Sequence, residues 1–288
     1  MSVLPRANLG GVSVGGGAPV VVMGALNVSP ESFHAGSVHR ESEALVEAAV
    51  AMVEAGAALI DVGARSTAPY LDTDISDDEE ARRLAAAVDA LAAKLSVPVS
   101  ADTCRPGPAR AALESGARVL NDVHGLRDRA LAQLAAEHEV SLILMAFPES
   151  HGAAADDGGP LALTRALLAS CLERARLAGI PDDRVVLDPG IGFFRQGPRS
   201  WDLHDVAVLA GLHELSALGR PLGVGVSRKS FIGAITRRPA TADRLAGSLA
   251  ATAVAVLNGA ALIRTHDVAE TLDAARVAER VLEAARDA

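Results

Sequence analysis

The chain contains eight short apolar runs rich in β-branched residues, and each is followed by a stretch with helical periodicity. The apolar runs occupy or open the segments 20–28, 58–63, 97–102, 118–123, 141–147, 184–190, 224–233 and 260–267. The helical stretches are expected near 41–56, 77–95, 106–116, 128–138, 161–179, 201–218, 242–258 and 268–285. Eight strand–helix units in 288 residues predict an α/β protein with a single-domain (β/α)8 TIM barrel, whose strands are buried on both faces.

The barrel is expected to occupy residues 19–288, after a Gly-rich N-terminal lead-in or hairpin at 1–18. A doubly wound open sheet is the alternative. It is disfavoured because no glycine-rich dinucleotide fingerprint follows the first apolar run. The polar or Gly-rich connections at 29–40, 65–80 and 148–160 are candidate loops over a site. The acidic run at 72–80 is expected to start and solvate a helix.

Composition excludes several classes of partner. The net charge of −9 argues against a general nucleic-acid surface. We expect no membrane association, because no apolar run reaches transmembrane length and the N-terminus lacks a signal-peptide pattern. Cys104 and Cys171 do not form a disulfide framework or a zinc-site spacing, so a reducing cytoplasm is expected. Cys104 is interpreted as a small filler and not as a nucleophile.

Polar residues gather at the carboxyl ends of the predicted strands, where (β/α)8 barrels build their sites. One group combines carboxylate, amide and lysine chemistry and comprises Asp102, Asn121, Asp188 and Lys229. Carboxylates and amides can read the hydrogen-bonding edge of a flat heterocycle, so this group suits a guanine-like or pterin-like ring. Met145 is a suitable apolar wall. Each polar residue alone could equally be satisfied by neighbouring loops, but four at equivalent ends favour a site.

A second group suits an anion and comprises Asn27, Ser227, Arg228, Arg264 and His266. Arg264 and His266 are two residues apart on a strand, so their side chains point to one side. Arginine binds phosphate oxygens in pairs, and the oxygen of Asn27 could hold magnesium against a diphosphate. For Arg228 a surface ion pair is favoured over a ligand role. For His266 a helix-capping or packed histidine is the alternative.

Four segments together resemble the signatures of dihydropteroate synthases. They are 23–33 (MGALNVSPESF), 188–193 (DPGIGF), 227–233 (SRKSFIG) and 263–268 (IRTHDV), and the family forms are MGILNVTPDSF, DPGFGF, SRKSFIG and RVHDV. The shorter segments 100–103 and 121–123 also match. The resemblance implies a barrel that is usually a homodimer. It also implies a transferase that joins 6-hydroxymethyl-7,8-dihydropterin diphosphate to p-aminobenzoate, with Mg2+ and with release of diphosphate.

The resemblance also implies roles for individual residues. The pterin would be held by Asp102, Asn121, Asp188 and Lys229, and the diphosphate by Asn27, Arg264 and His266, with Asn27 near the magnesium. Phe193 and Lys229 would flank the aminobenzoate, with Ser230 close by, and Thr67 and Met145 complete the substrate-binding set. Lys229, Arg264 and His266 are the expected catalytic residues. Stabilising the leaving anion and placing the arylamine would be the main catalytic tasks.

Several positions depart from the family pattern. Residues 63–70 read GARSTAPY in place of GGESTRPG, so Arg65 replaces a glutamate and Ala68 an arginine. Residues 193–195 read FFR in place of FGK, and Ala146 replaces a histidine. One hypothesis is a larger arylamine, such as the ribofuranosyl-aminobenzene 5′-phosphate of tetrahydromethanopterin synthesis, with a second phosphate held by Arg65, Arg195 and His34. An ordinary folate enzyme with drifted loops, a pterin-dependent methyltransferase-like domain with a corrinoid partner, and a non-catalytic pterin-binding paralogue stay open.

Overall fold

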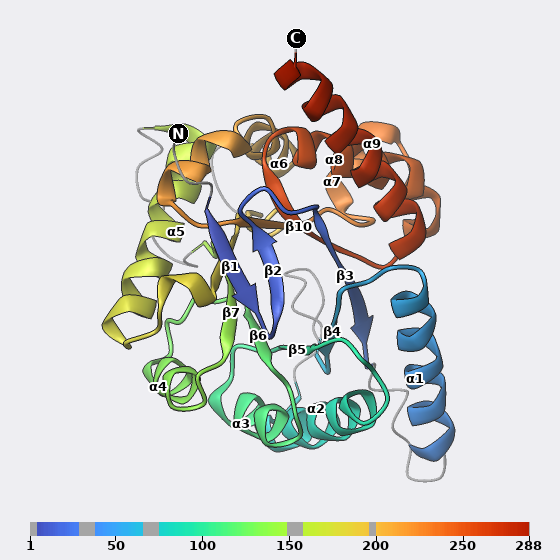
Figure 1. Ribbon diagram of the computed structural model, residues 1–288, viewed down its shortest axis with the longest axis vertical. Coiled ribbons are helices and arrows are strands. Elements are labelled where there is room, and N and C mark those ends of the chain that lie inside the picture. Colours follow the sequence, from blue (N-terminus) through green and yellow to red (C-terminus); the bar gives the residue numbers. More distant parts are fainter. Residues whose placement is uncertain (1–4, 29–37, 66–74, 149–157, 196–199, 288) are drawn as a thin grey trace.

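The computed structural model describes residues 5–28, 38–65, 75–148, 158–195 and 200–287. Eight parallel strands close into a barrel in the order β10-β3-β4-β5-β6-β7-β8-β9 (Figure 1). They are β3 (Val21–Asn27), β4 (Leu59–Gly63), β5 (Val99–Asp102), β6 (Val119–Asp122), β7 (Ser141–Met145), β8 (Val185–Asp188), β9 (Leu222–Gly225) and β10 (Ala260–Thr265). The predicted single-domain (β/α)8 barrel is confirmed, and the open-sheet alternative is wrong because β10 pairs with β3 and closes the sheet.

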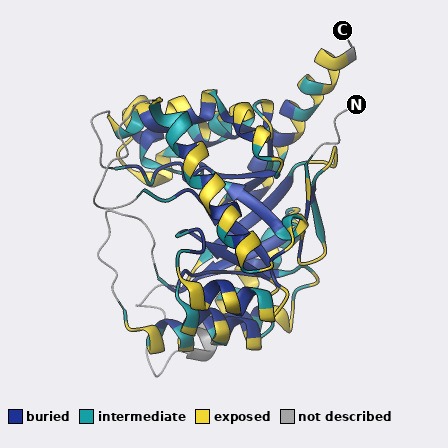
Figure 2. Cartoon of the chain, turned by 90° about the vertical axis from the view of Figure 1, so that its left-hand side faces the viewer, coloured by how far each residue is buried: buried dark blue, intermediate teal, exposed yellow. Residues whose placement is uncertain are grey.

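Helices surround the barrel and account for the outer layer. They are α1 (Val38–Glu54), α2 (Asp77–Ala92), α3 (Pro106–Glu114), α4 (Arg129–Glu137), α5 (Gly159–Leu177), α6 (Trp201–Ala210), α7 (Ser230–Thr236), α8 (Leu245–Leu257) and α9 (Val268–Asp287). Figure 2 shows the strands mostly dark blue and the outward sides of the helices largely yellow. The strands are therefore covered on both faces, which explains their near-continuous apolar sequence.

Two helix predictions were wrong in detail. The helix expected over 201–218 ends at Ala210, and the chain continues as a 3-10 helix over Leu212–Leu218. A Cβ on Gly211 would lie 2.6 Å from Leu161 Cδ2, so close packing favours glycine there, and glycine weakens a helix. Helix α7 was not predicted: its residues 230–233 were included in the segment of the seventh apolar run, and the next helix was expected only near 242.

The N-terminal hairpin closes one end of the barrel. Strands β1 (Arg6–Leu9) and β2 (Val12–Gly15) pair antiparallel and lie across the barrel opening in Figure 1. Their buried side chains Ala7, Leu9 and Val14 pack on an inward-facing apolar layer. That layer consists of Val21, Met23, Leu59, Val119, Ile143, Val186 and Leu262. Since apolar side chains fill the amino-terminal end of the barrel interior, a polar site inside the barrel is expected at the carboxyl ends of the strands.

Within the described residues, no single helix has the length and apolar character needed to cross a membrane. One helix pair, Ser230–Thr236 with Thr241–Leu257, meets the criterion jointly by length and composition, but it is bent by 79°.

Candidate active site

The floor of the site follows from the two-residue periodicity of strands. Side chains two positions apart point to the same face, so each residue two positions beyond the apolar layer also points into the barrel. On five strands this step changes the inward residue, from Leu59 to Asp61, Val119 to Asn121, Ile143 to Met145, Val186 to Asp188 and Leu262 to Arg264. Four of the five new residues are polar or charged. The barrel interior therefore changes from an apolar plug to a polar layer within one residue pair.

Arg264 is the centre of this polar layer. Its Nε donates to Asp61 Oδ2 at 2.6 Å, and its Nη2 donates to Asp102 Oδ2 at 3.0 Å. Asp61 is fully buried and also accepts from Asn121 Nδ2 at 3.1 Å and Ser100 Oγ at 2.6 Å. Burial lowers the pKa of Arg264, but Asp61 and Asp102 outweigh it, and the net shift is upward. The guanidinium therefore keeps its charge while holding two carboxylates together.

Asp61 is a member of the polar layer that the residues expected from the sequence did not include. It lies in the apolar segment 58–63 and belongs to none of the segments that resemble the family signatures. The parity rule would have found it, because Asp61 lies two residues after Leu59 and must face inward. The same network places Arg264 between the two groups of residues expected from the sequence. It was expected among the anion-binding residues, and its guanidinium is hydrogen-bonded to Asp61 and to Asp102 of the heterocycle group.

Asp102 carries an unused hydrogen-bond acceptor. Its Oδ1 is buried and has no hydrogen-bond partner among the described residues. Burial, reinforced by the charge of Asp61, raises the pKa of Asp102 to about 7. A buried acceptor without a donor is unfavourable by about 1–3 kcal/mol, so such groups in native proteins call for a specific explanation. A ligand with N–H donors would supply the missing partner.

Replacing Asp102 by asparagine should change how stability depends on pH. Because folding raises the pKa of Asp102 from 3.8 to about 7, the folded state binds more protons in that range. Stability contributed by this group is therefore lost as pH rises from about 4 to about 7. Asparagine cannot ionise but still offers an oxygen to Arg264. Between pH 4 and pH 7, the unfolding free energy of Asp102→Asn should therefore rise relative to that of wild type by up to about 4 kcal/mol.

Urea unfolding at pH 4.5 and pH 7.5 measures this difference. The exposed variant Asp89→Asn should follow the wild-type pH dependence and is the control. A constant difference between Asp102→Asn and wild type at the two pH values would contradict a raised pKa.

Asp188 ends β8 and Lys229 follows β9, across the barrel from the strands β4 and β5 that carry Asp61 and Asp102. Asp188 Oδ1 accepts from the backbone N–H of Gly190 at 2.7 Å, and burial raises its pKa. Lys229 Nζ lies 4.4 Å from the centroid of the Phe193 ring, within the range of a cation–π contact. Burial lowers the pKa of Lys229 to about 8 despite nearby Asp188. Lys229 therefore loses its proton at a lower pH than an exposed lysine, and a bound ligand can change its protonation.

Apolar side chains form a wall beside these charges. Cys104, Val123 and Met145 are buried together, with Phe147 and Phe193 packed against them. The ring of Phe147 lies 4.7 Å from that of His124. Burial raises the pKa of the Cys104 thiol to about 12, in agreement with its interpretation as a filler. Flat rings pack well between such surfaces, while the carboxylates read their edges.

The expected anion group is only partly assembled. Asn27 is exposed at the end of β3, and its Oδ1 would lie 3.6 Å from a Cβ placed on Gly63. His266 Nδ1 lies 3.0 Å from Ser227 Oγ at the surface. Arg228 makes a two-bond ion pair with Asp267, with Nε at 2.9 Å from Oδ2 and Nη2 at 2.5 Å from Oδ1, so the surface-pair interpretation is confirmed.

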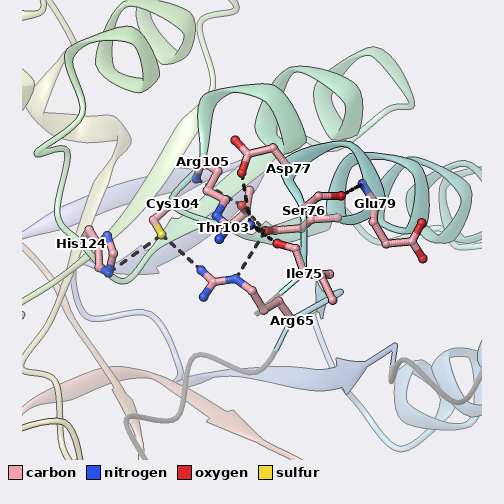
Figure 3. A network of polar contacts seen from close by, with 10 residues as sticks. Arg65, Ile75, Ser76, Asp77, Glu79, Thr103, Cys104, Arg105 and His124 are labelled. Atoms are coloured by element: carbon pink, nitrogen blue, oxygen red, sulfur yellow. Dashed lines mark hydrogen bonds and ion pairs between the residues drawn. The ribbon is translucent and has the colours of Figure 1, made fainter. Parts of the chain in front are cut away.

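A second charged network lies beside the site and is drawn in Figure 3. Its hub is Glu80, whose carboxylate is 1% exposed. Thr103 Oγ1 donates to Glu80 Oε1 at 2.6 Å, and Arg105 Nη1 and Arg65 Nε lie 3.1 and 3.4 Å from Oε2. Arg65 Nη2 also approaches Cys104 Sγ at 3.7 Å. Arg65 therefore ends beside the apolar wall.

The prediction for the acidic run was half right. Helix α2 begins at Asp77, and Ser76 caps it by accepting from the Glu79 N–H at 3.2 Å. The expectation of a solvated face fails at Glu80, which turns inward to bind two arginines. Sequence reasoning missed this pairing because the partners are 15 and 25 residues away in the chain.

The three residues suggested for a second phosphate are not seen as one cluster. Arg65 pairs with Glu80, whereas Arg195 donates to Ser230 Oγ and lies over the Trp201 ring. His34 lies outside the described residues, and so does Thr67 of the substrate-binding set.

Fold and site together define a class: a (β/α)8 barrel enzyme with a buried, mixed-charge site at the carboxyl ends of its strands. The family model described as "Pterin binding enzyme" matches residues 23–266. The chain belongs to the dihydropteroate synthase family of pterin-binding enzymes. It is accordingly a transferase that forms a carbon–nitrogen bond.

Two relatives illustrate the similarity in sequence. Dihydropteroate synthase of Escherichia coli strain K12 is 36% identical over 266 residues, which cover 91% of this chain and 92% of that protein. Dihydropteroate synthase of Mycobacterium leprae is 39% identical over 272 residues, which cover 90% and 93%.

Two solved structures illustrate the similarity in fold. Xanthomonas albilineans dihydropteroate synthase with 4-aminobenzoic acid has a TM-score of 0.85 and 36% identity, covering 97% of this chain and 98% of that one. The enzyme from the same organism in complex with 7,8-dihydropteroate has a TM-score of 0.82 and 35% identity, covering 96% and 99%.

Proposed function

We propose that the chain condenses 6-hydroxymethyl-7,8-dihydropterin diphosphate with p-aminobenzoate, releasing diphosphate, in folate biosynthesis. The observation that carries this proposal is the unpartnered buried oxygen of Asp102 within the polar layer of Asp61, Asn121, Asp188 and Arg264. The amino group and ring N–H of a pterin are donors of the kind this oxygen lacks. The names and ligands of the relatives support the same reaction.

The residues divide the chemistry between recognition and charge. Asp102, Asn121 and Asp188 read the edges of the pterin, and Met145 and Phe193 line its faces. Lys229 donates to the ring while it is protonated. Breaking the carbon–oxygen bond leaves a diphosphate anion, which the positive charge of Arg264 and the neutral ring of His266 stabilise. His266 reaches the surface, and desolvation and then the charge of Arg264 lower its pKa to about 4, so the ring is neutral before substrate binds and can donate one N–H.

The arylamine then needs placement more than activation. Its nitrogen lone pair attacks the methylene carbon, whose developing positive charge is shared with the electron-rich pterin. Holding the two reactants in line can replace a strong base. Phe193 and Ser230 are the residues that we assign to the arylamine side.

Magnesium is proposed to enter with the diphosphate. Among the residues that the structure describes, no group of three or more His, Cys, Asp or Glu side chains could hold a metal ion on its own. The exposed amide oxygen of Asn27 suits an ion that takes one protein ligand and completes its shell with phosphate oxygens and water. Bound there, magnesium would neutralise charge on the leaving group.

Incubating the purified protein with the pterin diphosphate and each of two arylamines tests the reaction. We expect diphosphate release and a coupled product with p-aminobenzoate. Coupling only with ribofuranosyl-aminobenzene 5′-phosphate would move the assignment to tetrahydromethanopterin synthesis. Pterin binding without diphosphate release from either would favour a methyltransferase-like or non-catalytic role and overturn the proposal.

We also propose that the protein is a homodimer that pairs through α6, α7 and α8. Helix α8 carries no charged residue, and apolar side chains of all three helices reach the surface. The exposed set comprises Leu203 and Val206 on α6, Ile235 on α7, and Val254 and Leu257 on α8. These helices contact one another, and we propose that their exposed apolar residues form one surface. Apolar surface of this kind marks an interaction site.

Introducing a charge into this surface should abolish the dimer. Ile235→Asp and Val254→Asp are expected to halve the mass measured by light scattering after gel filtration. Leu177→Asp is the matched control, because Leu177 is 79% exposed at the end of α5 and should leave the mass unchanged. A monomeric wild-type protein would contradict the proposal.

A further inference from the structure

Helix α6 presents one face to the segment that follows β8. Trp201, His204 and Asp205 are spaced at i, i+3 and i+4, so they share one side of the helix. The His204 ring stacks on Phe194 with centroids 4.1 Å apart and planes at 17°. The Trp201 ring centroid lies 4.1 Å from the guanidinium carbon of Arg195. Helix α6 is thus anchored on the segment at both of these positions.

Asp205 makes the third contact, and it is the most buried of the three. The residue is 1% exposed, and its Oδ1 accepts from the backbone N–H of Gly192 at 2.8 Å. Its Oδ2 is buried and, within the described part of the chain, has no hydrogen-bond partner. Gly192 has φ +88°, a conformation that favours glycine. The hydrogen bond therefore fixes a peptide group that has no side chain of its own to hold it.

Lys229 packs against the same glycine. A Cβ built on Gly192 would lie 3.0 Å from Lys229 Cδ and 3.5 Å from its Nζ. A side chain at this position would press against the lysine Cδ and would be strained by the positive φ of the residue. Gly192 is therefore in contact with a buried carboxylate and with a half-buried lysine. Arg195 completes the arrangement, because its Nε donates to the Gly192 carbonyl at 3.0 Å.

The charges around Lys229 come from four elements. Asp188 follows from β8, Arg264 from β10, Asp205 from α6 and Asp102 from β5. Burial is the main influence and lowers the pKa of Lys229, the three carboxylates raise it, and Arg264 lowers it. Of these carboxylates, only Asp205 lies outside the strands of the barrel. It can support the lysine without competing for the substrate.

We propose that Asp205 is a positioning residue for Lys229, which it supports from α6 through the Gly192 peptide and through its negative charge. The placement of Lys229 is a property of the folded protein. Only the effect on turnover rests on the function proposed above.

The composition of the chain allows a direct measurement. It contains two lysines, Lys94 and Lys229, beside 25 arginines. Protein labelled with 13C at the lysine ε-carbon should give two resonances, and Lys94 is exposed and serves as an internal reference. Asp205→Asn keeps an oxygen for the Gly192 N–H and removes the charge. We expect the pKa of Lys229 to fall by about half a unit or more in this variant, with Lys94 unchanged.

Asp122→Asn is the matched control. Asp122 is also 1% exposed and also accepts backbone N–H groups, from His124 at 2.8 Å and Leu126 at 2.6 Å. Its replacement should leave the titration of Lys229 in place. An unshifted Lys229 in Asp205→Asn, or an equal shift in Asp122→Asn, would overturn the proposal.

Kinetics supply a second readout. In Asp205→Asn, the loss of kcat/KM relative to wild type should grow as pH rises past 7 and shrink toward pH 6, where Lys229 is protonated again. Asp205→Ala removes the hydrogen bond too and should lower kcat/KM by a further factor of about ten at every pH. A loss independent of pH in Asp205→Asn would indicate a purely structural role. If wild type turns over no substrate, the proposed function fails while the lysine titration still decides the role of Asp205.

Discussion

Replacing Arg264 by alanine should lower the free energy of unfolding by about 3–5 kcal/mol. The guanidinium is the shared partner of Asp61 and Asp102, at 2.6 and 3.0 Å. Asp61 is fully buried and Asp102 is 7% exposed, so removing the cation leaves two adjacent carboxylates without compensation. The upward net shift in the pKa of Arg264 also indicates that the folded state stabilises the charged guanidinium.

Urea unfolding at pH 7 measures the effect, with Arg176→Ala as the control. Arg176 makes an equally regular two-bond pair with Asp182, at 2.9 and 2.7 Å, but both side chains are exposed. Loss of an exposed pair should change stability by no more than about 1 kcal/mol. Lowering the pH toward 4 should narrow the deficit of Arg264→Ala, since protonation removes the uncompensated charge. If Arg264→Ala and Arg176→Ala lost the same unfolding free energy, the buried network would stabilise the fold no more than an exposed ion pair.

The strand repeat made the fold predictable. Eight apolar runs separated by helical stretches admit few arrangements, and burial on both faces required their continuous apolar character. The two-residue periodicity of strands also predicts much of the polar layer. Asn121, Asp188 and Arg264 face inward because each lies two residues beyond an apolar residue of the plug. Asp61 obeys the same rule, since it lies two residues after Leu59, but it belongs to none of the segments that resemble the family signatures.

Contacts between distant segments could not be predicted. Glu80 looks like any residue of an acidic helix start, and only the folded chain brings Arg65 and Arg105 to it. The face formed by Trp201, His204 and Asp205 has helical spacing, yet its target at 192–195 becomes apparent only in three dimensions. Asp205 is hidden from sequence reasoning for a further reason: a buried aspartate on an outer helix matches no expected catalytic position.

The two cations of the site have opposite pKa shifts, and this separates their roles. Carboxylates overcome the burial of Arg264, whereas burial prevails at Lys229. With 25 arginines and two lysines, the chain has arginine at almost all of its basic positions. Lysine differs from arginine in that it can lose its proton within reach of neutral pH. The presence of lysine at 229 therefore favours a role in which its charge depends on the ligand.

Lys229→Met should consequently separate activity from stability. We expect kcat/KM to fall by at least about 100-fold, because a donor aimed at the substrate is lost. Stability at pH 7 should be unchanged or higher by up to about 3 kcal/mol, since folding lowers the pKa of Lys229 from 10.5 to about 8. Below about pH 8 the wild-type protein folds with an unfavourably buried ammonium, which methionine replaces by an apolar chain of similar length.

The sign of this effect can be checked by raising the pH. Between about pH 8 and 10.5 the unfolded chain binds more protons than the folded protein, so wild-type stability should rise relative to Lys229→Met across that window. Urea unfolding at pH 7 and pH 9.5 measures the difference, and Lys94→Met, at an exposed position, supplies the reference. A variant less stable than wild type at pH 7 would show that the ammonium stabilises the fold, and the site would then lack the ligand-dependent cation that we assign to it.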